Sequence, residues 1–273
     1  MTSRESESLE DVAGATPLAE RQDAGKALWR NGLGVRLRIV AAAAMCTVLV
    51  CVSVALIDRP VATWVHEHLG YQRYSWFAAN FHGHMLRFGP FSFMAGPAEA
   101  IRPLTALVFA VLAIAATAGW RPKMRGRIAL ALCLSVFASL VISGMAKEAF
   151  GRTWPESWLG DNPSWIRDGA YGFFPFHGGD GWGSFPSGHT SVVTAPATIL
   201  WLVWPELRVL EATIVVVVVA GLIGGNYHFV SDIIGGLLLG VAIGLGVAGL
   251  VLSPKDRVAV NRQPIEADAV GRS

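Results

Sequence analysis

Residues 209–252 read VLEATIVVVVVAGLIGGNYHFVSDIIGGLLLGVAIGLGVAGLVL, which is two long apolar runs joined by a short polar turn. The first run covers about residues 209–226 and the second about residues 230–252. Runs of about 18 or more apolar residues are typical of helices that span a bilayer. This stretch therefore predicts a helical hairpin inside a membrane, and it indicates an all-α fold.

The composition of the whole chain agrees with a polytopic membrane protein. Of its 273 residues, 53% are hydrophobic and 15% are charged, whereas soluble domains carry about 25% charged residues. The net charge is +2 and the sequence has no basic tract, so nothing in it indicates a nucleic-acid partner. Four further apolar runs bring the predicted number of transmembrane helices to six: about residues 35–57, 103–120, 128–149 and 187–204.

The polar segments define the domain organisation that we expect. Residues 1–34 predict a disordered tail, and they begin with neither the basic stretch nor the apolar core of a signal peptide. Residues 35–253 form the predicted six-span membrane domain, and residues 254–273 form a second disordered tail. Segment 58–100 is too polar to cross the bilayer, and its aromatic residues favour short interfacial helices between spans one and two.

Basic residues mark the side of the membrane on which each loop lies. They occur at four places that share one side if there are six spans: Arg30, Arg36 and Arg38, the hairpin 121–127, Arg208, and Lys255 with Arg257. Short cytoplasmic loops carry Lys and Arg, so both tails are expected in the cytoplasm. We therefore predict a multi-pass protein of a cytoplasmic (inner) membrane, with segment 58–100 and loop 150–185 facing the periplasm or the exterior.

Three polar clusters lie on that predicted outer side, at the ends of four different spans. They are Lys147 with Arg152, the sequence Pro186-Ser187-Gly188-His189, and Asn226 with His228 and Asp232. Ionisable residues at a membrane boundary that face a helix bundle are functional candidates. Packing of six helices can bring the clusters together, although they are far apart in the sequence.

The second cluster is suited to binding an anion. Proline is favoured at the first position of a helix, so Pro186 indicates that a helix begins here. Ser187 and Gly188 then offer backbone N–H groups at a helix N-terminus, where phosphate binds readily. His189 would point from the first turn toward the same place. The alternative is an ordinary helix start with a polar histidine at the membrane interface.

The other two clusters supply a nucleophile and cations. Residues four apart share one helix face, so Asp232 can orient His228 and leave its second ring nitrogen free to attack. Lys147 and Arg152 can neutralise phosphoryl oxygens. The alternative for His228 and Asp232 is a structural pair that ties two helices together. The alternative for Lys147 and Arg152 is that their long side chains extend to the membrane interface without a functional role. As a set, the residues predict phosphoryl transfer through a phosphohistidine, with no metal and no other cofactor.

At these residues the sequence resembles the type 2 phosphatidic acid phosphatase superfamily, over about residues 100–250. The family pattern begins with Lys, six residues and Arg-Pro, which here is Lys147 followed by Trp154-Pro155. Pro-Ser-Gly-His is complete at 186–189. The third part is Ser-Arg, five residues, His, three residues and Asp, of which His228 and Asp232 are present.

The resemblance implies a phosphoric ester or diphosphate hydrolase that acts on a membrane lipid phosphate. Polyprenyl diphosphate, lipid A and phosphatidylglycerol phosphate are candidate substrates. His228 resembles the family's nucleophile, His189 its general acid and Asp232 the partner of the nucleophile. Lys147, Ser187 and Gly188 resemble its phosphate ligands.

The sequence departs from the family pattern at two phosphate-binding arginines. Trp154 stands at the first position and Leu222 at the second. We expect Arg152 and Asn226 to take over their role. Two other functions stay open: a lipid phosphotransferase with the same intermediate, and a non-catalytic membrane protein of the same fold. The sequence does not indicate an oligomeric state.

Overall fold

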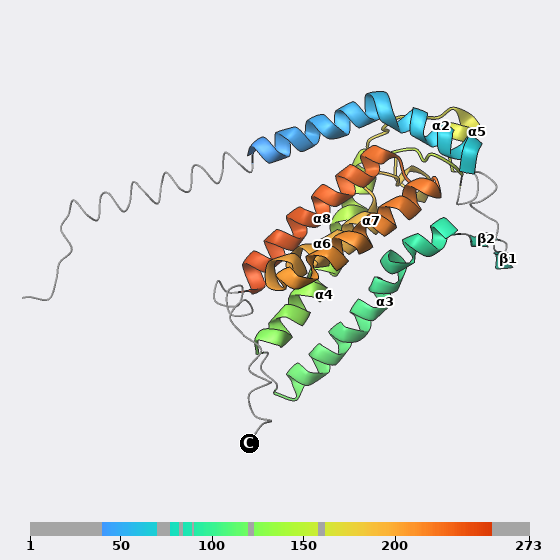
Figure 1. Ribbon diagram of the computed structural model, residues 1–273. Coiled ribbons are helices and arrows are strands. Elements are labelled where there is room, and N and C mark those ends of the chain that lie inside the picture. Colours follow the sequence, from blue (N-terminus) through green and yellow to red (C-terminus); the bar gives the residue numbers. More distant parts are fainter. Residues whose placement is uncertain are drawn as a thin grey trace, which may run out of the picture. The chain divides into compact units, whose positions relative to one another are not determined.

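The computed structural model describes residues 40–69, 77–81, 84–88, 90–119, 123–157 and 162–252. The chain divides into two compact units, Met1–Thr47 and Val48–Ser273, and the site discussed below lies in the second. The two predicted tails, 1–34 and 254–273, fall outside the described residues. Apart from one short hairpin, the described regular structure is helical (Figure 1).

Five of the described helices are long and apolar enough to cross a membrane. They are Val40–Leu69, Phe93–Thr117, Met124–Phe150, Pro205–Gly224 and Val230–Val251. A further apolar helix, Gly188–Val203, is shorter. The chain is therefore a helical protein with the properties of a multi-pass membrane protein, and each of the six predicted apolar runs overlaps one of these helices.

The elements from Ser53 onward follow one another in a simple order. The helical elements are η1 (Ser53–Ile57, a π-turn), α2 (Asp58–Leu69), α3 (Pro90–Thr117), α4 (Met124–Phe150), α5 (Trp165–Asp168), η3 (Asp180–Trp182), α6 (Gly188–Val203), η4 (Pro205–Leu207), α7 (Arg208–Gly224) and α8 (Val230–Val251). Strands β1 (Phe77–Phe81) and β2 (His84–Phe88) pair in antiparallel fashion. Helices α4, α6, α7 and α8 run side by side, and α3 packs against α7 and α4 (Figure 1).

Segment 58–100 differs from the expected short interfacial helices. Helix α2 follows η1 directly, the β1–β2 hairpin comes next, and α3 begins at Pro90. Asp58, Ala62 and Val65 are the buried residues of α2, and their spacing of four and three residues places them on one helix face. The average polarity of segment 58–100 therefore did not reveal that α2 is an amphipathic helix, which packs against α7 and α8.

Glycines of α8 allow α6 and α8 to pack closely. A Cβ at Gly236 would stand 2.6 Å from the carbonyl oxygen of Ser187, and one at Gly244 would stand 2.5 Å from that of Ala195. Such small residues let transmembrane helices approach and gain van der Waals contacts. These glycines explain the close packing of α8 against α6. It brings the N-terminus of α6 against the first turn of α8, where Ser187 N–H donates to the Asp232 carbonyl at 3.0 Å.

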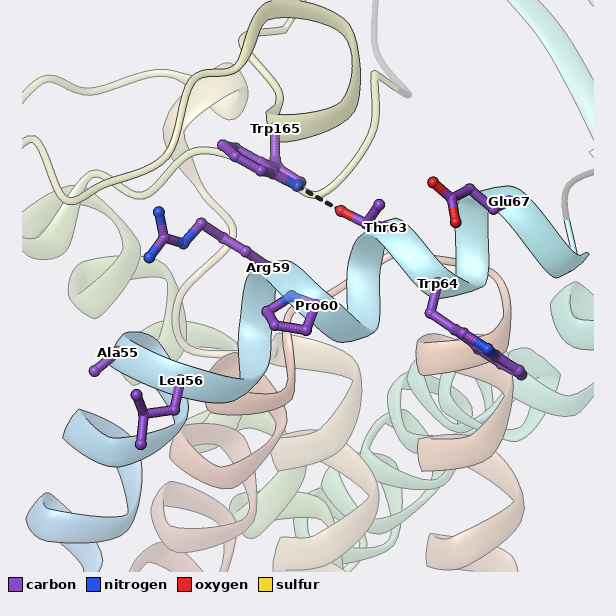
Figure 2. Close-up of a pocket in the computed structure, with 8 residues that line it drawn as sticks. All are labelled: Ala55, Leu56, Arg59, Pro60, Thr63, Trp64, Glu67 and Trp165. Atoms are coloured by element: carbon purple, nitrogen blue, oxygen red, sulfur yellow. Dashed lines mark hydrogen bonds between the residues drawn. The ribbon is translucent and has the colours of Figure 1, made fainter.

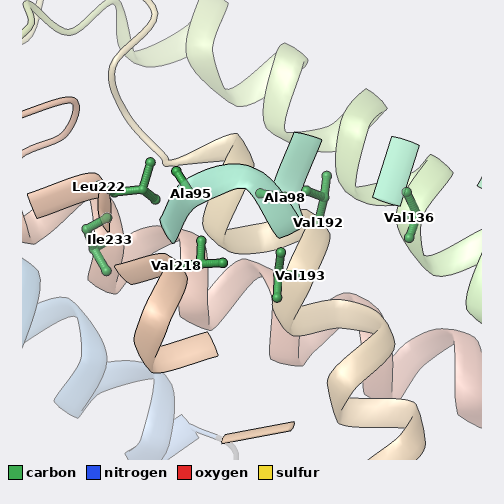
Figure 3. Close-up of a cluster of buried hydrophobic side chains, with 8 residues drawn as sticks. All are labelled: Ala95, Ala98, Val136, Val192, Val193, Val218, Leu222 and Ile233. Atoms are coloured by element: carbon green, nitrogen blue, oxygen red, sulfur yellow. The ribbon is translucent and has the colours of Figure 1, made fainter. Parts of the chain in front are cut away.

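A cluster of small and branched apolar side chains joins α3 to α4, α6, α7 and α8 (Figure 3). It consists of Ala95, Ala98, Val136, Val192, Val193, Val218, Leu222 and Ile233. At Gly221 an added Cβ would stand 2.7 Å from the carbonyl oxygen of Phe91, so α7 and α3 approach as closely as α8 and α6 do. Leu222 is 1% exposed in this core.

Candidate active site

The predicted polar clusters meet at one end of the helices. The ring centroids of His189, in the first turn of α6, and His228, in the α7–α8 turn, are 5.9 Å apart. The ring of Trp154 lies 5.3 Å from that of His228, and the Lys147 ammonium lies 5.7 Å from the Trp154 ring. The ends of α4 and α7 and the start of α6 thus contribute to a single site.

His228 is buried beside the carboxylate of Asp232. The His228 side chain is 1% exposed, and its Nδ1 lies 3.6 Å from Asp232 Oδ2, which is beyond hydrogen-bond length but within ion-pair range. Burial lowers the pKa of His228 to about 4, although the nearby Asp232 carboxylate favours the charged form. His228 is therefore neutral at neutral pH, and a neutral imidazole has the lone pair that nucleophilic attack needs.

The carboxylate of Asp232 is fixed by several donors. Its Oδ2 accepts hydrogen bonds from the backbone N–H of Phe229, at 2.9 Å, and from the Ser184 hydroxyl. Its Oδ1 accepts from Arg152 Nη1 at 2.7 Å. Asp232 cannot turn away from His228 without breaking these bonds, so the carboxylate holds its place before any substrate binds.

The structure contradicts the expected role of Arg152 as a phosphate ligand. Its side chain is 0% exposed, and it pairs with two buried carboxylates: Nη1 with Asp232 at 2.7 Å and Nη2 with Asp58 at 2.6 Å. The rings of Phe173 and Phe229 lie 4.6 and 4.7 Å from the guanidinium carbon. A group so enclosed and neutralised cannot turn to a substrate, so Arg152 positions Asp232 instead.

Asp58 is a member of this network that the sequence analysis missed. Its side chain accepts hydrogen bonds from Ser53 Oγ and Ser231 N–H, each at 2.9 Å, and from the Ser231 hydroxyl. Tyr171 OH donates to it at 3.1 Å. A signal was present, because an ionisable residue that directly follows an apolar run at a membrane boundary is a functional candidate.

Asn226 does not face the site either. Its Nδ2 donates to the carbonyl oxygen of Ala62 at 3.1 Å, and the residue is 2% exposed. Its φ of 56° lies in the left-handed region, which asparagine tolerates better than most residues. Asn226 therefore shapes the α7–α8 turn and ties it to α2, and the expectation that it binds phosphate is wrong.

The N-terminus of α6 offers an anion site that is shifted by one residue from the expected one. The Ser187 N–H is already bonded to the Asp232 carbonyl, and the Ser187 Oγ caps the helix by accepting from Thr190 N–H at 3.3 Å. The backbone N–H groups of Gly188 and His189 bond to no group in the described part of the chain. The N–H groups that remain to bind an anion at this helix end are therefore those of Gly188 and His189, rather than those of Ser187 and Gly188.

The ammonium group of Lys147 stands beside this helix end. A Cβ built on Gly188 would be 3.8 Å from Lys147 Nζ, so cation and helix N-terminus are adjacent. Lys147 forms no ion pair within the described ranges of the chain. Its charge is therefore available to an anion held by the N–H groups of α6.

The two positions at which the family has arginine supply no cation. The Trp154 Nε1 donates to the carbonyl oxygen of Asp180 at 3.0 Å, and its ring lies near both the His228 ring and the Lys147 ammonium. Leu222 is packed in the apolar core. Trp154 thus covers the nucleophile, whereas Leu222 has no part in the site.

A second pair that the sequence analysis missed comes from α3. His189 Nε2 is hydrogen-bonded to Glu99 Oε1, and Arg102 Nη1 donates to Glu99 Oε2 at 3.1 Å. The spacing of three residues that puts Glu99 and Arg102 on one helix face is visible in the sequence. Their place beside His189 is not, because it depends on how α3 packs.

The comparison with protein families covers most of α4 and all of α6, α7 and α8. The PAP2 superfamily model matches residues 128–253. Over these residues the chain belongs to the PAP2 superfamily. Membership supports a phosphatase, in general a phosphoric ester hydrolase. No curated protein and no solved structure matches the chain.

The PAP2 core, residues 128–253, contains His189 and His228 of the site as well as Asp232, Lys147 and Arg152. Asp58, Glu99 and Arg102 lie before it, in α2 and α3. The site is therefore completed by charged residues from outside the matched range.

An open pocket of about 490 Å³ lies along η1 and α2 and is also lined by Trp165 (Figure 2). Trp165 Nε1 donates to Thr63 Oγ1 at 3.0 Å across it. The Arg59 guanidinium carbon is 5.2 Å from the ring centroid of Tyr171 and 5.8 Å from that of Trp165. These contacts attach loop 150–185 of the PAP2 core to α2.

Proposed function

We propose that the chain is a phosphatase that removes phosphate from a membrane lipid phosphate or diphosphate through a phosphohistidine. One observation carries the proposal: the neutral, buried His228 lies close to both Asp232 and His189, in a site that also holds the Lys147 cation, for which the described residues provide no ion-pair partner. Membership of the PAP2 superfamily supports phosphatase chemistry in general.

In the proposed first half-reaction, the phosphoryl group binds to the N–H groups of Gly188 and His189 and to the Lys147 ammonium. Because Nδ1 of His228 faces Asp232, Nε2 attacks phosphorus in line. A P–N bond forms, and the P–O bond to the lipid breaks. His189 gives its proton to the leaving oxygen. Asp232 stabilises the positive charge that develops on His228.

In the second half-reaction, water attacks the phosphohistidine. His189, which is now deprotonated, takes a proton from that water, and the P–N bond breaks. Orthophosphate leaves, and His228 is again neutral. Both half-reactions use the same stabilising groups, because the same phosphoryl oxygens carry the charge each time.

We infer a six-span arrangement in which the shorter helix α6 is a span. Its 16 residues are about 24 Å long, compared with about 30 Å for the bilayer core. The N-terminal half of α3, the starts of α6 and α8 and the ends of α4 and α7 share the site, as alternating crossings require. The basic residues Arg125, Arg127 and Arg208 belong to the opposite helix ends, which supports a site on the outer face and tails in the cytoplasm.

The proposed substrate class follows from where the site lies. Lys147, His189 and Asp232 belong to the first or last turns of candidate spans, which is where lipid head groups are found. A short α6 lets a phosphate group reach the N–H groups of its first turn from the head-group layer. Polyprenyl diphosphate, lipid A and phosphatidylglycerol phosphate all carry such a phosphate.

The proposal can be tested with purified full-length protein in detergent and a panel of these lipid phosphates. We expect orthophosphate release. With a lipid phosphate that is labelled in its phosphoryl group, we also expect the label to become covalently attached to the wild type in an acid-labile, base-stable form. His228→Ala should lose both. The absence of release from every lipid would contradict the proposal, and so would labelling of His228→Ala.

One observation favours a second candidate, the lipid phosphotransferase. The His228 side chain is only 1% exposed, and Trp154 lies against it, so water reaches the nucleophile poorly. A phosphohistidine under this cover would pass its phosphoryl group to a bound lipid hydroxyl. Adding a lipid alcohol to the assay separates the two candidates, because transfer consumes substrate without an equal release of orthophosphate.

A further inference from the structure

The site has fewer cations than its family pattern prescribes, and α3 carries a guanidinium that is not yet explained. Arg102 Nη1 donates to Glu99 Oε2 at 3.1 Å, and the other oxygen of Glu99 is hydrogen-bonded to His189 Nε2. Glu99 is the only ion-pair partner of Arg102 among the residues that the structure describes. The carboxylate therefore bridges the proposed general acid and this arginine.

A bridging carboxylate occupies the kind of position that a phosphoryl group would take. Arginine binds carboxylate and phosphate with the same donors, since both present two oxygens on one central atom. A phosphoryl group within reach of His189 Nε2 would therefore also be within reach of Arg102. Arg102 and Lys147 are both cations, so a dianion bound near both would be stabilised by two positive charges.

The Glu99–Arg102 pair can open far more easily than the Arg152 pairs. The side chains of Arg102 and Glu99 are 37% and 58% exposed, whereas those of Arg152 and its two aspartates are 0% exposed. A phosphoryl group can therefore reach the partly exposed Glu99–Arg102 pair, and it offers Arg102 and His189 new acceptors in place of Glu99. A substrate can displace Glu99, but it cannot displace Asp58 or Asp232.

The packing of α3 explains why an arginine from this helix can serve the site. Leu222 stands at the family's arginine position on α7, and it shares a buried cluster with Ala95 and Ala98 of α3 (Figure 3). Residues 95, 98 and 102 are three and four apart, so Arg102 lies on the same face of α3 as these alanines. The helix that packs over the position of the missing arginine thus carries Arg102 toward the site.

We propose that Arg102 is the phosphate-binding guanidinium of this site, and that Glu99 holds Arg102 and His189 until the phosphoryl group of the substrate displaces its carboxylate. This inference rests on the proposed function, because it assigns a ligand to the same phosphoryl group. On displacement, the ion pair and hydrogen bond of Glu99 break, and Arg102 and His189 bond to phosphoryl oxygens. Arg102 is then the charge-assisted donor that Trp154 and Leu222 do not provide.

The test measures the binding of inorganic phosphate to the full chain in detergent, by calorimetry and by inhibition of lipid-phosphate hydrolysis. Arg102→Gln should weaken phosphate binding and raise KM by about tenfold to a hundredfold. Arg102→Lys should recover part of the loss, because it keeps the charge without the forked geometry. Arg208→Gln is the matched control and should change nothing, since Arg208 bonds to the Trp201 carbonyl beyond the far end of α6.

The variant Glu99→Gln distinguishes two roles of Glu99: a carboxylate that the phosphoryl group displaces, and a carboxylate that orients His189. If the carboxylate competes with phosphate, this variant binds phosphate more tightly, and the gain disappears in the double variant with Arg102→Gln. If Glu99 instead orients His189, the variant lowers kcat and leaves phosphate binding unchanged, which overturns the role given to Glu99. Unchanged phosphate binding in folded Arg102→Gln and Arg102→Lys overturns the role given to Arg102.

The calorimetric measurement keeps this inference distinct from the proposed function. If the wild type hydrolyses no lipid phosphate, the proposed function fails. Phosphate binding that still depends on Arg102 would then support the ligand assignment alone. Hydrolysis by the wild type together with wild-type constants for both Arg102 variants would support the function and overturn the inference.

Discussion

Arg152 Nη1 and Asp232 Oδ1 are 2.7 Å apart, and neither side chain is exposed to solvent. A second buried carboxylate, that of Asp58, pairs with the other terminal nitrogen of Arg152 at 2.6 Å. The partner of the proposed nucleophile is thus held in place by a cation that itself never meets the substrate. Two consequences of this arrangement can be measured separately.

Removing Arg152 should destabilise the protein strongly. Arg152→Ala leaves two buried carboxylates without a counter-charge, and breaking a buried pair in this way costs about 3–5 kcal/mol. Thermal unfolding in detergent would show a large fall in the melting temperature. The control is Arg167→Ala, which removes an exposed arginine paired with Asp168 and should have a small effect. Equal melting temperatures for the two variants would contradict the structural role of Arg152.

Asp58→Asn should weaken the same network from its other end. The substitution removes the negative charge that faces Arg152 and replaces one acceptor oxygen by an NH2 donor, so that at most one of the two bonds from Ser231 remains, without the charge that makes such a bond worth about 1.5–3 kcal/mol. We expect a lower melting temperature together with a lower kcat, because Arg152 no longer holds Asp232 in one position. Asp168→Asn, on the surface, is the matched control. A normal kcat in folded Asp58→Asn would show that Asp232 needs no support from α2.

The rate of phosphoenzyme formation should stay high in mildly acidic solution. Burial lowers the pKa of His228 to about 4, below the usual value of 6.5, so the nucleophile is lost only as the pH falls through about 4. We expect the acid limb of kcat/KM near pH 4. An acid limb of the wild type near pH 6.5 would contradict the buried state of His228.

Trp154→Ala provides the matched variant for this pH dependence. Removing the ring hydrates His228, so its pKa should rise toward 6.5 and the acid limb of kcat/KM should move up with it. The direction follows from desolvation, which disfavours the charged imidazole in the wild type. An acid limb that stays near pH 4 in this variant would show that Trp154 does not keep His228 dry.

Glycines on α8 offer an internal comparison of tight and open positions. Gly236→Ala and Gly244→Ala place a methyl group 2.6 and 2.5 Å from backbone oxygens of α6, which forces the helices apart and should cost about 1–3 kcal/mol. Gly246→Ala and Gly249→Ala have no atom within 4 Å and should be neutral or slightly stabilising. Thermal unfolding of the four variants would test this, and a loss of stability in all four would rule out a specific α6–α8 contact.

Hydropathy and short-range spacing explain what could be predicted from the sequence. The apolar runs mark the helices because a bilayer demands long stretches without charge. Contrary to the expectation from their spacing, His228 precedes α8 and does not share a helix face with Asp232, but the two residues are only four positions apart across the start of α8, so their proximity is a local property. Ser187 likewise marks the start of α6 as its N-cap, whereas Pro186 lies before the cap and not at the first helical position that was expected for it.

Long-range pairing explains what could not be predicted. Whether Arg152 faces a substrate or a carboxylate depends on Asp58, which is 94 positions away. The bond from Asn226 to Ala62 spans 164 positions, and the one from His189 to Glu99 spans 90. Nothing local distinguishes an arginine that binds phosphate from one that is buried. The family pattern also gave no warning, because these partners lie before the PAP2 core.

The bond between Asp58 and Arg152 also determines where this protein can be divided. A fragment limited to residues 128–253 would keep both histidines and Asp232, but it would leave Arg152 with half of its counter-charge and the Ser231 N–H without its acceptor. The smallest fragment that folds and reacts should therefore begin before Ser53, whose hydroxyl bonds to Asp58. Adding the N-terminal part as a separate chain should restore activity to fragment 128–253. The helix that carries Asp58 would then complete the active site without a covalent link to the rest of it.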